Sequence, residues 1–424
     1  MRQILDFNEN WWFIHADVDV SEARPGDGEL VSLPHTWNAL DGQKGDGTYD
    51  RGSYWYVKTL DKWEPSAKYS RLFLEIPAAG QQAKVFVNGE FVVSHEGGYS
   101  AFRADITEKC TEEFNTIAIW CSNEKCDAIY PQSADFTFYG GLYRGAHLIC
   151  VPETHFELLH YGDLGIHAAT EPASWDKEDF MLHIRAQICG AGKENQVIYQ
   201  IFDEDGKEVA GAARPADSPD TSIPLYKPHR WDIKNGYQYT LKALIMRNNE
   251  CLDEVELKFG VRTFCCDSGR GFLINGNCVP LRGVSRHQDK LYQGNALTRE
   301  DHIRDAELIE EIGANTVRLA HYQHAQEFYD ECDKRGFVVW AEIPFISVMN
   351  EEPLAHENCI TQLKELIYQN DHHPSICFWG ISNEILIGGI SEKLVENHRE
   401  LNALAKKIDP YRLTTIAHVT MTPK

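Results

Sequence analysis

The sequence lacks any long hydrophobic run. Its 424 residues hold no apolar stretch near the roughly 18 residues that a membrane-spanning helix needs. Residues 1–13 also lack the basic segment and apolar stretch of a secretory signal. With 43% hydrophobic residues, the composition is that of a globular protein. We therefore expect a folded, cytoplasmic protein with no membrane partner.

Positive charge is scarce. The 41 lysines and arginines face 64 aspartates and glutamates, which gives a net charge of −23. No cluster of basic residues offsets this charge, so a polyanion would be repelled. The composition therefore excludes nucleic acid as an expected partner.

Metal-ligand spacing is absent as well. The twelve cysteines are scattered, and the adjacent pair Cys265 and Cys266 cannot form an ordinary disulfide without strain. The neighbouring His372 and His373 do not have the spacing of a zinc site either. We predict reduced thiols, no metal and no cofactor.

The chain is long enough for two or three domains. Residues 1–151 contain short β-rich segments separated by Gly, Pro and Asn, which is typical of a jelly-roll sandwich. Asn88-Gly89 lies between two alternating runs, a strong hairpin signal. The segments expected to be strands are Tyr54–Lys58, Arg71–Ile76 and Thr116–Trp120.

Residues 152–264 repeat the β-rich pattern over a length close to the roughly 100 residues of an immunoglobulin-like sandwich. The expected strands are Met181–Ile188, Gln196–Phe202, Tyr237–Met246 and Val255–Phe259.

Residues 265–424 alternate apolar strands with amphipathic helices, which predicts βα units and a parallel sheet. The expected strands are Val279–Val284, Thr316–Ala320, Val338–Glu342, Ile376–Ile381 and Thr414–Ala417. The expected helices are Arg299–Ile312, Gln323–Arg335, Glu357–Gln369 and Glu392–Ile408. This region is shorter than the about 250 residues of a complete (β/α)₈ TIM barrel. The predicted fold is therefore a multi-domain β plus α/β protein that ends in an incomplete barrel.

The strongest chemical signal is Asn383-Glu384, which follows the fourth expected barrel strand. Strand ends carry the active sites of such barrels, and glycoside cleavage needs a protonated carboxyl with a raised pKa. A helix N-cap is the alternative for an isolated Asn-Glu pair. The position after an apolar, aromatic strand favours the catalytic interpretation.

Other polar residues follow neighbouring strands. His287 and His321 could be buried structural histidines, but their place at successive strand ends favours contact with a ligand. Arg318 could form a structural ion pair, or it could keep a carboxylate from another strand ionised.

Several motifs resemble glycoside hydrolase family 2, with its β-galactosidase branch as the best match. In the barrel region they are Leu-Arg-Gly-Val-Ser-Arg-His at 281–287, Val-Arg-Leu-Ala-His-Tyr at 317–322, Val-Val-Trp-Ala-Glu-Ile-Pro at 338–344 and Trp-Gly-Ile-Ser-Asn-Glu at 379–384. Upstream, Leu-Pro-His-Thr-Trp-Asn at 33–38, Arg-Gly-Ser-Tyr-Trp-Tyr at 51–56 and Tyr-Gly-Gly-Leu-Tyr-Arg at 139–144 resemble the family's sugar-binding jelly roll.

The resemblance implies a role for each matching position. It makes Glu384 the general acid/base of a retaining enzyme that hydrolyses terminal β-D-galactosides. Substrate-binding roles fall to Asn383, His287, His321, Asp135 and Arg318, and Arg318 would also contact the nucleophile. Trp379, an aromatic residue that could stack on a sugar ring, is a further substrate-binding candidate. Some relatives bind magnesium beside the acid/base, but the third strand here lacks the Glu-x-His part of that pattern.

The family's nucleophile lies at the end of the seventh strand, and no residue after Glu384 qualifies for that role. We therefore expect this chain alone to be inactive. A non-catalytic carbohydrate-binding fragment, with Trp37, Trp55 and Trp379 stacking on sugar, stays open, as does a β-glucuronidase. The open edge of a five-stranded sheet predicts a possible homo-oligomer.

Overall fold

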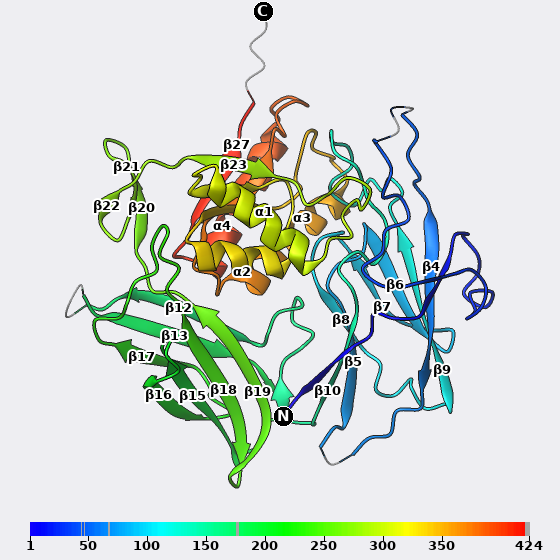
Figure 1. The fold of residues 1–424 in the computed structure, drawn as a ribbon, viewed down its shortest axis with the longest axis horizontal. Coiled ribbons are helices and arrows are strands. Elements are labelled where there is room, and N and C mark those ends of the chain that lie inside the picture. The colour runs from blue at the N-terminus through cyan, green and yellow to red at the C-terminus, as the bar shows by residue number, and fades with distance from the viewer. Residues whose placement is uncertain (44, 46, 67, 175–177, 420–424) are drawn as a thin grey trace, which may run out of the picture.

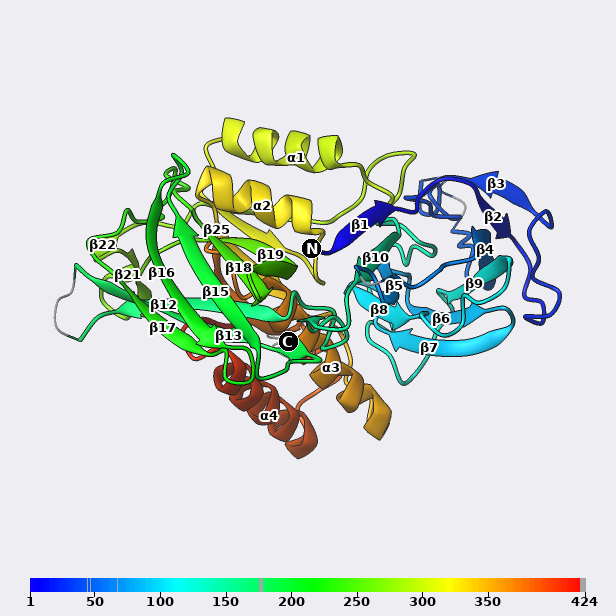
Figure 2. The same cartoon turned by 90° about the horizontal axis from the view of Figure 1, so that it is seen from below.

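The computed structural model describes residues 1–43, 45, 47–66, 68–174 and 178–419. Two antiparallel β regions come first along the chain, and an α/β region with a parallel sheet follows them (Figure 1). Figure 2 shows the first β region, coloured blue to cyan, and the second, coloured green, on different sides of the helical region. None of the described helices is long and apolar enough to cross a membrane.

The first β region is built from two sheets, with strand orders β3-β2-β4-β9-β6-β7 and β1-β10-β5-β8. Apolar side chains such as Trp11, Tyr56 and Leu74 form its buried core. The predicted hairpin is confirmed, because Asn88 (φ 52°) and Gly89 (φ 78°) form the turn between β6 and β7. The strands are β1 Gln3–Asp6, β2 Trp11–Ile14, β3 Glu29–Val31, β4 Ser53–Asp61, β5 Arg71–Ile76, β6 Gln82–Val87, β7 Glu90–Glu96, β8 Phe102–Asp105, β9 Phe114–Ser122 and β10 His147–Val151.

The second β region consists mainly of the sheets β12-β13-β17 and β16-β15-β18-β19. In β15, Val197, Tyr199 and Ile201 are buried while the residues between them are more exposed, which is the period of a strand with one face in the core. The strands are β11 His155–Phe156, β12 Ile166–Pro172, β13 Phe180–Ala186, β14 Ile188–Cys189, β15 Asn195–Phe202, β16 Glu208–Pro215, β17 Thr221–Leu225, β18 Tyr239–Arg247 and β19 Glu250–Phe259. The jelly-roll and immunoglobulin-like assignments of the two regions stay predictions.

The α/β region has the parallel sheet order β23-β24-β25-β26-β27. Its main core lies between this sheet and the helices and includes Val317, Phe328, Leu363 and Leu401. The helices are α1 Arg299–Glu311, α2 Gln326–Arg335, α3 Pro353–Asn370 and α4 Glu392–Ile408. The parallel strands are β23 Gly283–Arg286, β24 Thr316–Leu319, β25 Val338–Glu342, β26 Ile376–Asn383 and β27 Leu413–Ala417.

The first parallel strand begins later than the sequence predicts. Val279, expected to start it, instead donates a backbone hydrogen bond to Phe272 in a small antiparallel sheet. Pro280 follows and has no N–H to give to a ladder, so pairing with β24 starts only at Gly283. The small sheet itself was not predicted. It consists of β20 Phe264–Asp267, β21 Gly271–Ile274 and β22 Asn277–Cys278.

An apolar groove of about 530 Å³ runs along β26, β27 and α4 and is lined by Ile381, Leu386, Ile390, Leu394 and Ile416, among others. The groove lies at the edge of the parallel sheet that is formed by β27, the last strand in its order. Oligomerisation through this edge stays a prediction.

Polar contacts join the three regions. Arg2 forms an ion pair with Asp253, from Nη2 to Oδ2 at 2.7 Å, between the first and second β regions. Gln369 of α3 accepts the backbone N–H of Ala101 at 3.1 Å and so fastens the α/β region to the first. Because each contact satisfies buried or half-buried polar groups, the regions are expected to keep a fixed arrangement.

One buried ion pair lies in the first β region at its border with the second. Arg103 binds Glu75 through Nε at 2.6 Å and also donates to the backbone oxygens of Leu158 and Asp163 at 2.8 and 2.6 Å. Burial alone would raise the pKa of Glu75, but Arg103 and His147 together lower it to about 2. The ionised carboxylate therefore stabilises the fold above its unfolded pKa near 4.5.

We predict that Glu75→Gln lowers the free energy of unfolding at pH 7 by about 2–3 kcal/mol. As pH falls from about 4.5 to about 2, the variant should lose less stability than the parent, because the contribution of Glu75 protonation is missing while Asp163 and Asp301 still titrate. Urea unfolding at several pH values measures both effects. Glu64→Gln, at an exposed residue paired with Lys62, is the control and should behave like the parent. Identical acid profiles for Glu75→Gln and the parent would contradict the assignment.

Candidate active site

The carboxyl ends of the parallel strands bring polar side chains to one edge of the sheet. Arg318 lies on β24, Glu342 ends β25 and Asn383 ends β26. In the parallel pairing Arg318 lies opposite Trp340, two residues before Glu342, and Glu342 lies opposite Gly380, three residues before Asn383. These residues form the rim on which the sequence predicts an active site.

A buried ion pair forms the centre of the rim. Arg318 donates to both carboxylate oxygens of Glu342, from Nε to Oε2 at 3.0 Å and from Nη2 to Oε1 at 2.8 Å. The same Nη2 lies 2.6 Å from Asn383 Oδ1, and the guanidinium carbon lies 4.6 Å from the centre of the Trp340 ring. Glu342 has no exposed surface, so its charge depends on these partners.

His321 completes this cluster and links it to His287. His321 Nδ1 lies 2.7 Å from Glu342 Oε1, and the two histidine rings lie 5.1 Å apart, edge to face. His287 Nδ1 contacts the Tyr322 hydroxyl at 3.2 Å. Burial and the nearby His321 lower the pKa of His287, so at neutral pH its imidazole is uncharged and can either donate or accept a hydrogen bond.

A loop of the first β region reaches this rim. The Phe136 ring lies 5.1 Å from the His287 ring, 5.5 Å from Tyr322 and 6.0 Å from His321. Asp135, the preceding residue, is exposed and close enough to influence the charge of His287. The structure therefore brings Asp135 to the same end of the sheet as the histidines, as the resemblance implied.

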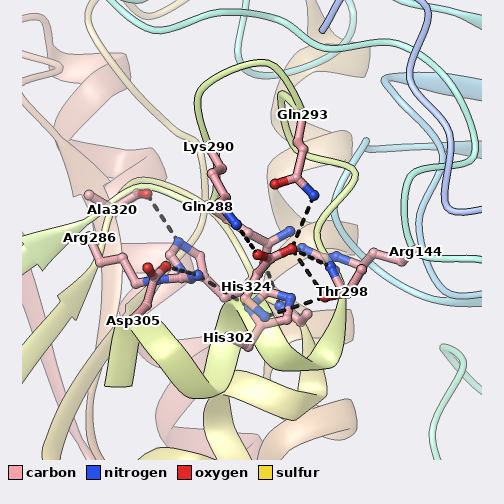
Figure 3. A network of polar contacts seen from close by, with 12 residues as sticks. Arg144, Arg286, Gln288, Lys290, Gln293, Thr298, His302, Asp305, Ala320 and His324 are labelled. Carbon is pink, nitrogen blue, oxygen red and sulfur yellow. Dashed lines mark hydrogen bonds and ion pairs between the residues drawn. The ribbon is translucent and has the colours of Figure 1, made fainter. Parts of the chain in front are cut away.

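A polar network beneath the rim fixes the loops that carry the histidines (Figure 3). Arg286 is bound by Asp305 at 2.6 Å and donates to His302 Nδ1 and His324 Nδ1 at 3.2 and 3.1 Å. Burial and the Arg286 cation lower the pKa of His302 to about 3 and that of His324 well below its usual value. Both rings are therefore neutral acceptors, which lets them hold the arginine without repulsion.

Arg144 extends this network across the border between regions (Figure 3). This residue of the first β region donates to the backbone oxygen of Gln323 at 2.7 Å and to Gln288 Oε1 at 3.3 Å. Gln288 follows His287 in the chain, and Gln323 lies two residues after His321. Arg144, which lies outside the α/β region, therefore holds the two loops that carry His287 and His321.

Glu384 lies at the rim, but its environment differs from the expectation. Its backbone N–H donates to Ala417 at 2.9 Å, which fixes the residue beside β27, and its φ angle is 50°. The side chain is exposed within the described part of the chain. The desolvated pocket that the sequence analysis expected is therefore not formed by the described residues.

The prediction for Trp379 is wrong. The side chain is completely buried in the core between the sheet and the helices, and its Nε1 donates to Asp409 at 2.9 Å. Successive side chains of a strand point to opposite faces, so Trp379 faces the helices. Trp55, a second stacking candidate, is also buried, with 4% of its surface exposed.

Three further residues of the site, Glu342, Trp340 and Tyr322, were not predicted from the sequence. Glu342 ends a strand, so its position alone was a usable signal. The roles of Trp340 and Tyr322 depend on contacts with Arg318 and His287 that no local pattern reveals.

Within the described ranges, two groups of side chains have the geometry to hold a metal ion. They are His160, Asp163 and His167, and Asp330, Asp333 and His373. Neither group includes a residue of the rim.

We predict that Arg318→Met destabilises the protein by about 3 kcal/mol or more, because it leaves the buried Glu342 carboxylate without its main cation. The double variant Arg318→Met with Glu342→Leu should recover part of the loss, since no buried charge remains. Chemical unfolding of the four members of this cycle measures the coupling. Arg304→Met, in an exposed pair with Glu307, is the control and should change stability little. If the two single substitutions had additive effects on the free energy of unfolding, the proposed coupling of Arg318 and Glu342 would be contradicted.

Comparisons with known proteins agree with this architecture. The family model "Glycosyl hydrolases family 2" matches residues 173–262, and the model "Glycosyl hydrolases family 2, TIM barrel domain" matches residues 268–424. A β-glucuronidase of Bacteroides fragilis is 36% identical over 98% of this chain and 61% of its own length. A β-galactosidase of Thermoanaerobacter pseudethanolicus is 30% identical over 97% of this chain and 55% of its own length.

A solved structure described as "FMN-binding beta-glucuronidase from Facaelibacterium prausnitzii L2-6" is 49% identical, with a TM-score of 0.94. The match covers 100% of this chain and 64% of that one. The chain thus spans less than two thirds of the length of these relatives. Two models of one family, which match residues 173–262 and 268–424, place this chain in glycosyl hydrolase family 2.

Proposed function

We propose that this chain supplies the acid/base side of a retaining β-glycosidase active site, with Glu384 as the acid/base. The main support for this proposal is the pair of contacts that Arg318 makes with buried Glu342 and with Asn383. These contacts fix Asn383, the residue directly before Glu384, at the rim. A catalytic carboxyl needs such a rigid support to be held near the glycosidic oxygen.

The neighbouring residues suit the binding of a sugar. Arg318 donates a hydrogen bond to Asn383 Oδ1. The amide nitrogen of Asn383 is therefore the group that can donate to a sugar hydroxyl. Neutral His287 can donate to or accept from a second hydroxyl, and exposed Asp135 can accept from a third. Phe136, packed against His287, offers an apolar face beside these polar groups.

In the proposed reaction Glu384 gives its proton to the glycosidic oxygen as the bond to the anomeric carbon breaks. A second carboxylate, about 5 to 5.5 Å away in retaining enzymes, attacks that carbon and forms a glycosyl-enzyme. Glu384 then removes a proton from water, whose oxygen attacks the anomeric carbon and releases the sugar with its original configuration.

The described residues after Glu384 do not provide an evident nucleophile. Glu400 on α4 contacts His356 at 2.8 Å, and Asp409 is bound by Trp379 and Arg412 in the core. Both carboxylate oxygens of Glu342 accept hydrogen bonds from Arg318. We therefore expect no turnover from these 424 residues alone, and the activity tests require this chain within a protein that also contains the rest of the barrel.

Two glycones are candidates. The rim motifs led the sequence analysis to a terminal β-D-galactoside. The names of the relatives add weight to a β-glucuronide, because the 49% and 36% identical proteins are both named β-glucuronidases. We place the β-glucuronide first and keep the β-galactoside as the second candidate.

We predict that Glu384→Ala lowers kcat on a nitrophenyl glycoside by about 10²- to 10⁴-fold, because the leaving oxygen and the attacking water both lose their proton partner. Added azide should restore turnover and yield a β-glycosyl azide, since an anion needs no general base. Rates and product stereochemistry measure this.

The matched control is Glu392→Ala on α4, which should keep parental kinetics because this exposed residue lies outside the rim. If Glu384→Ala keeps its rate, or if azide fails to form the β-azide, Glu384 is not the acid/base. Sugar binding without turnover in the complete protein would instead support the carbohydrate-binding alternative.

For the glycone we predict that kcat/KM for 4-nitrophenyl β-D-glucuronide exceeds that for the galactoside by at least about 10²-fold, because a site built to bind a carboxylate rejects a substrate without one. The reverse ratio would establish the second candidate, and cleavage of neither substrate would overturn both.

A further inference from the structure

A histidine and aspartate cluster lies where the two β regions meet the α/β region. The chain makes a turn at 160–163, in which the Asp163 N–H donates to the His160 oxygen at 3.1 Å. This turn brings His160 Nδ1 to 2.7 Å from Asp163 Oδ2, and β12 places His167 Nε2 3.2 Å from the same oxygen. The three atoms lie within 4.8 Å of one another.

The His167 ring is buried, with 5% of the residue exposed. Its Nε2 has no hydrogen-bond partner within the described part of the chain, although the Asp163 carboxylate is 3.2 Å away. The distance is short enough for an ion pair, but the contact does not qualify as a hydrogen bond. His167 Nε2 therefore keeps the capacity to bind a further partner.

Two further contacts hold these atoms in place. His167 Nδ1 lies 2.8 Å from Asp371 Oδ2, and Asp163 Oδ1 accepts the N–H of Gly165 at 2.8 Å. A carboxylate bound to the far nitrogen of a histidine is the usual arrangement around metal-binding histidines, because it orients the ring and increases the basicity of the ligand nitrogen. Asp371 supplies this carboxylate from the end of α3.

We propose that His160, Asp163 and His167 bind one divalent transition-metal ion of the zinc type at the junction of the three regions. Two imidazole nitrogens and one carboxylate oxygen, completed by water, form a common zinc ligand set. Tetrahedral bonds of about 2.0–2.2 Å separate ligand atoms by roughly 3.3–3.5 Å, close to the 3.2 Å between His167 and Asp163. The 2.7 Å between His160 Nδ1 and Asp163 Oδ2 is a hydrogen bond, which a bound ion would replace and lengthen. The His160 side chain is 25% exposed, which gives the ion a route from solvent.

The other group with metal-binding geometry serves as an internal comparison. In it, His373 uses both ring nitrogens, Nδ1 toward Asp333 at 2.6 Å and Nε2 toward Gln326 at 3.0 Å. Asp333 Oδ1 also accepts the Ser375 N–H at 2.9 Å. Both ring nitrogens of His373 therefore have hydrogen-bond partners, whereas His167 Nε2 has none among the described residues, so we assign the metal to the first group.

The proposal is tested by adding Zn²⁺ or Co²⁺ to the chelator-treated chain. Titration calorimetry should show one equivalent of zinc, and Co²⁺ should give the visible absorption of a tetrahedral site. His160→Gln, at the most exposed ligand, should weaken zinc binding at least tenfold without disturbing the core. Asp371→Asn should keep the ligands but weaken binding by about 10- to 100-fold.

Matched controls locate the site. His183→Gln removes a partly exposed histidine of the same β region and should bind zinc like the parent, as should Asp330→Asn in the second group. Zinc should raise the melting temperature of the parent and of both controls, but not that of His160→Gln. Unchanged affinity in His160→Gln, loss of binding in Asp330→Asn, or no stoichiometric binding by the parent would each overturn the proposal.

Discussion

The Glu342 carboxylate is completely buried, and the arrangement of the rim depends on how its charge is balanced. A buried charge is tolerated only when cations and hydrogen-bond donors surround it. Arg318 makes a bidentate contact with the carboxylate, and His321 makes a third contact with it. Since Arg318 also binds Asn383, balancing one interior charge positions residues from three neighbouring strands. The candidate acid/base therefore follows a residue that is fixed from inside the sheet.

The rim also depends on the first β region. Arg144 binds the loops that follow β23 and β24, and Phe136 packs against both rim histidines. Neither residue belongs to the α/β region, so the first β region adds contacts to the loops that Arg286 and its partners hold from within the α/β region. This dependence gives a physical reason for the fixed contacts between regions, such as the Arg2 to Asp253 ion pair.

Much of the fold could be predicted from local patterns, because strand alternation, helix periodicity and an Asn-Gly turn are short-range signals. The barrel helices were expected within four residues of their observed bounds, and α4 matches its expected range. The predicted start of β23 was wrong, since Val279 donates its backbone N–H to Phe272 in the preceding small sheet instead. The burial of Trp379 and the exposure of Glu384 were missed for a related reason, because both depend on which elements pack over the ends of β26.

The site residues also divide into those that local sequence signals predict and those that depend on contacts between distant segments. Glu384, Asn383, His287 and His321 follow or end strands, and Arg318 is the last but one residue of β24. The rule that the carboxyl ends of parallel strands share one edge was therefore enough to predict that these residues lie together. The partner of Arg318 could not be chosen from sequence, because Glu342 has no spacing relation to it and becomes its neighbour only through pairing of β24 with β25. The metal-capable group is the opposite case. His160, Asp163 and His167 are close in sequence, but their significance comes from Asp371, more than two hundred residues later, which orients the His167 ring. Spacing rules detect ligands that lie on one element, and they do not detect a ligand whose direction is set by another region.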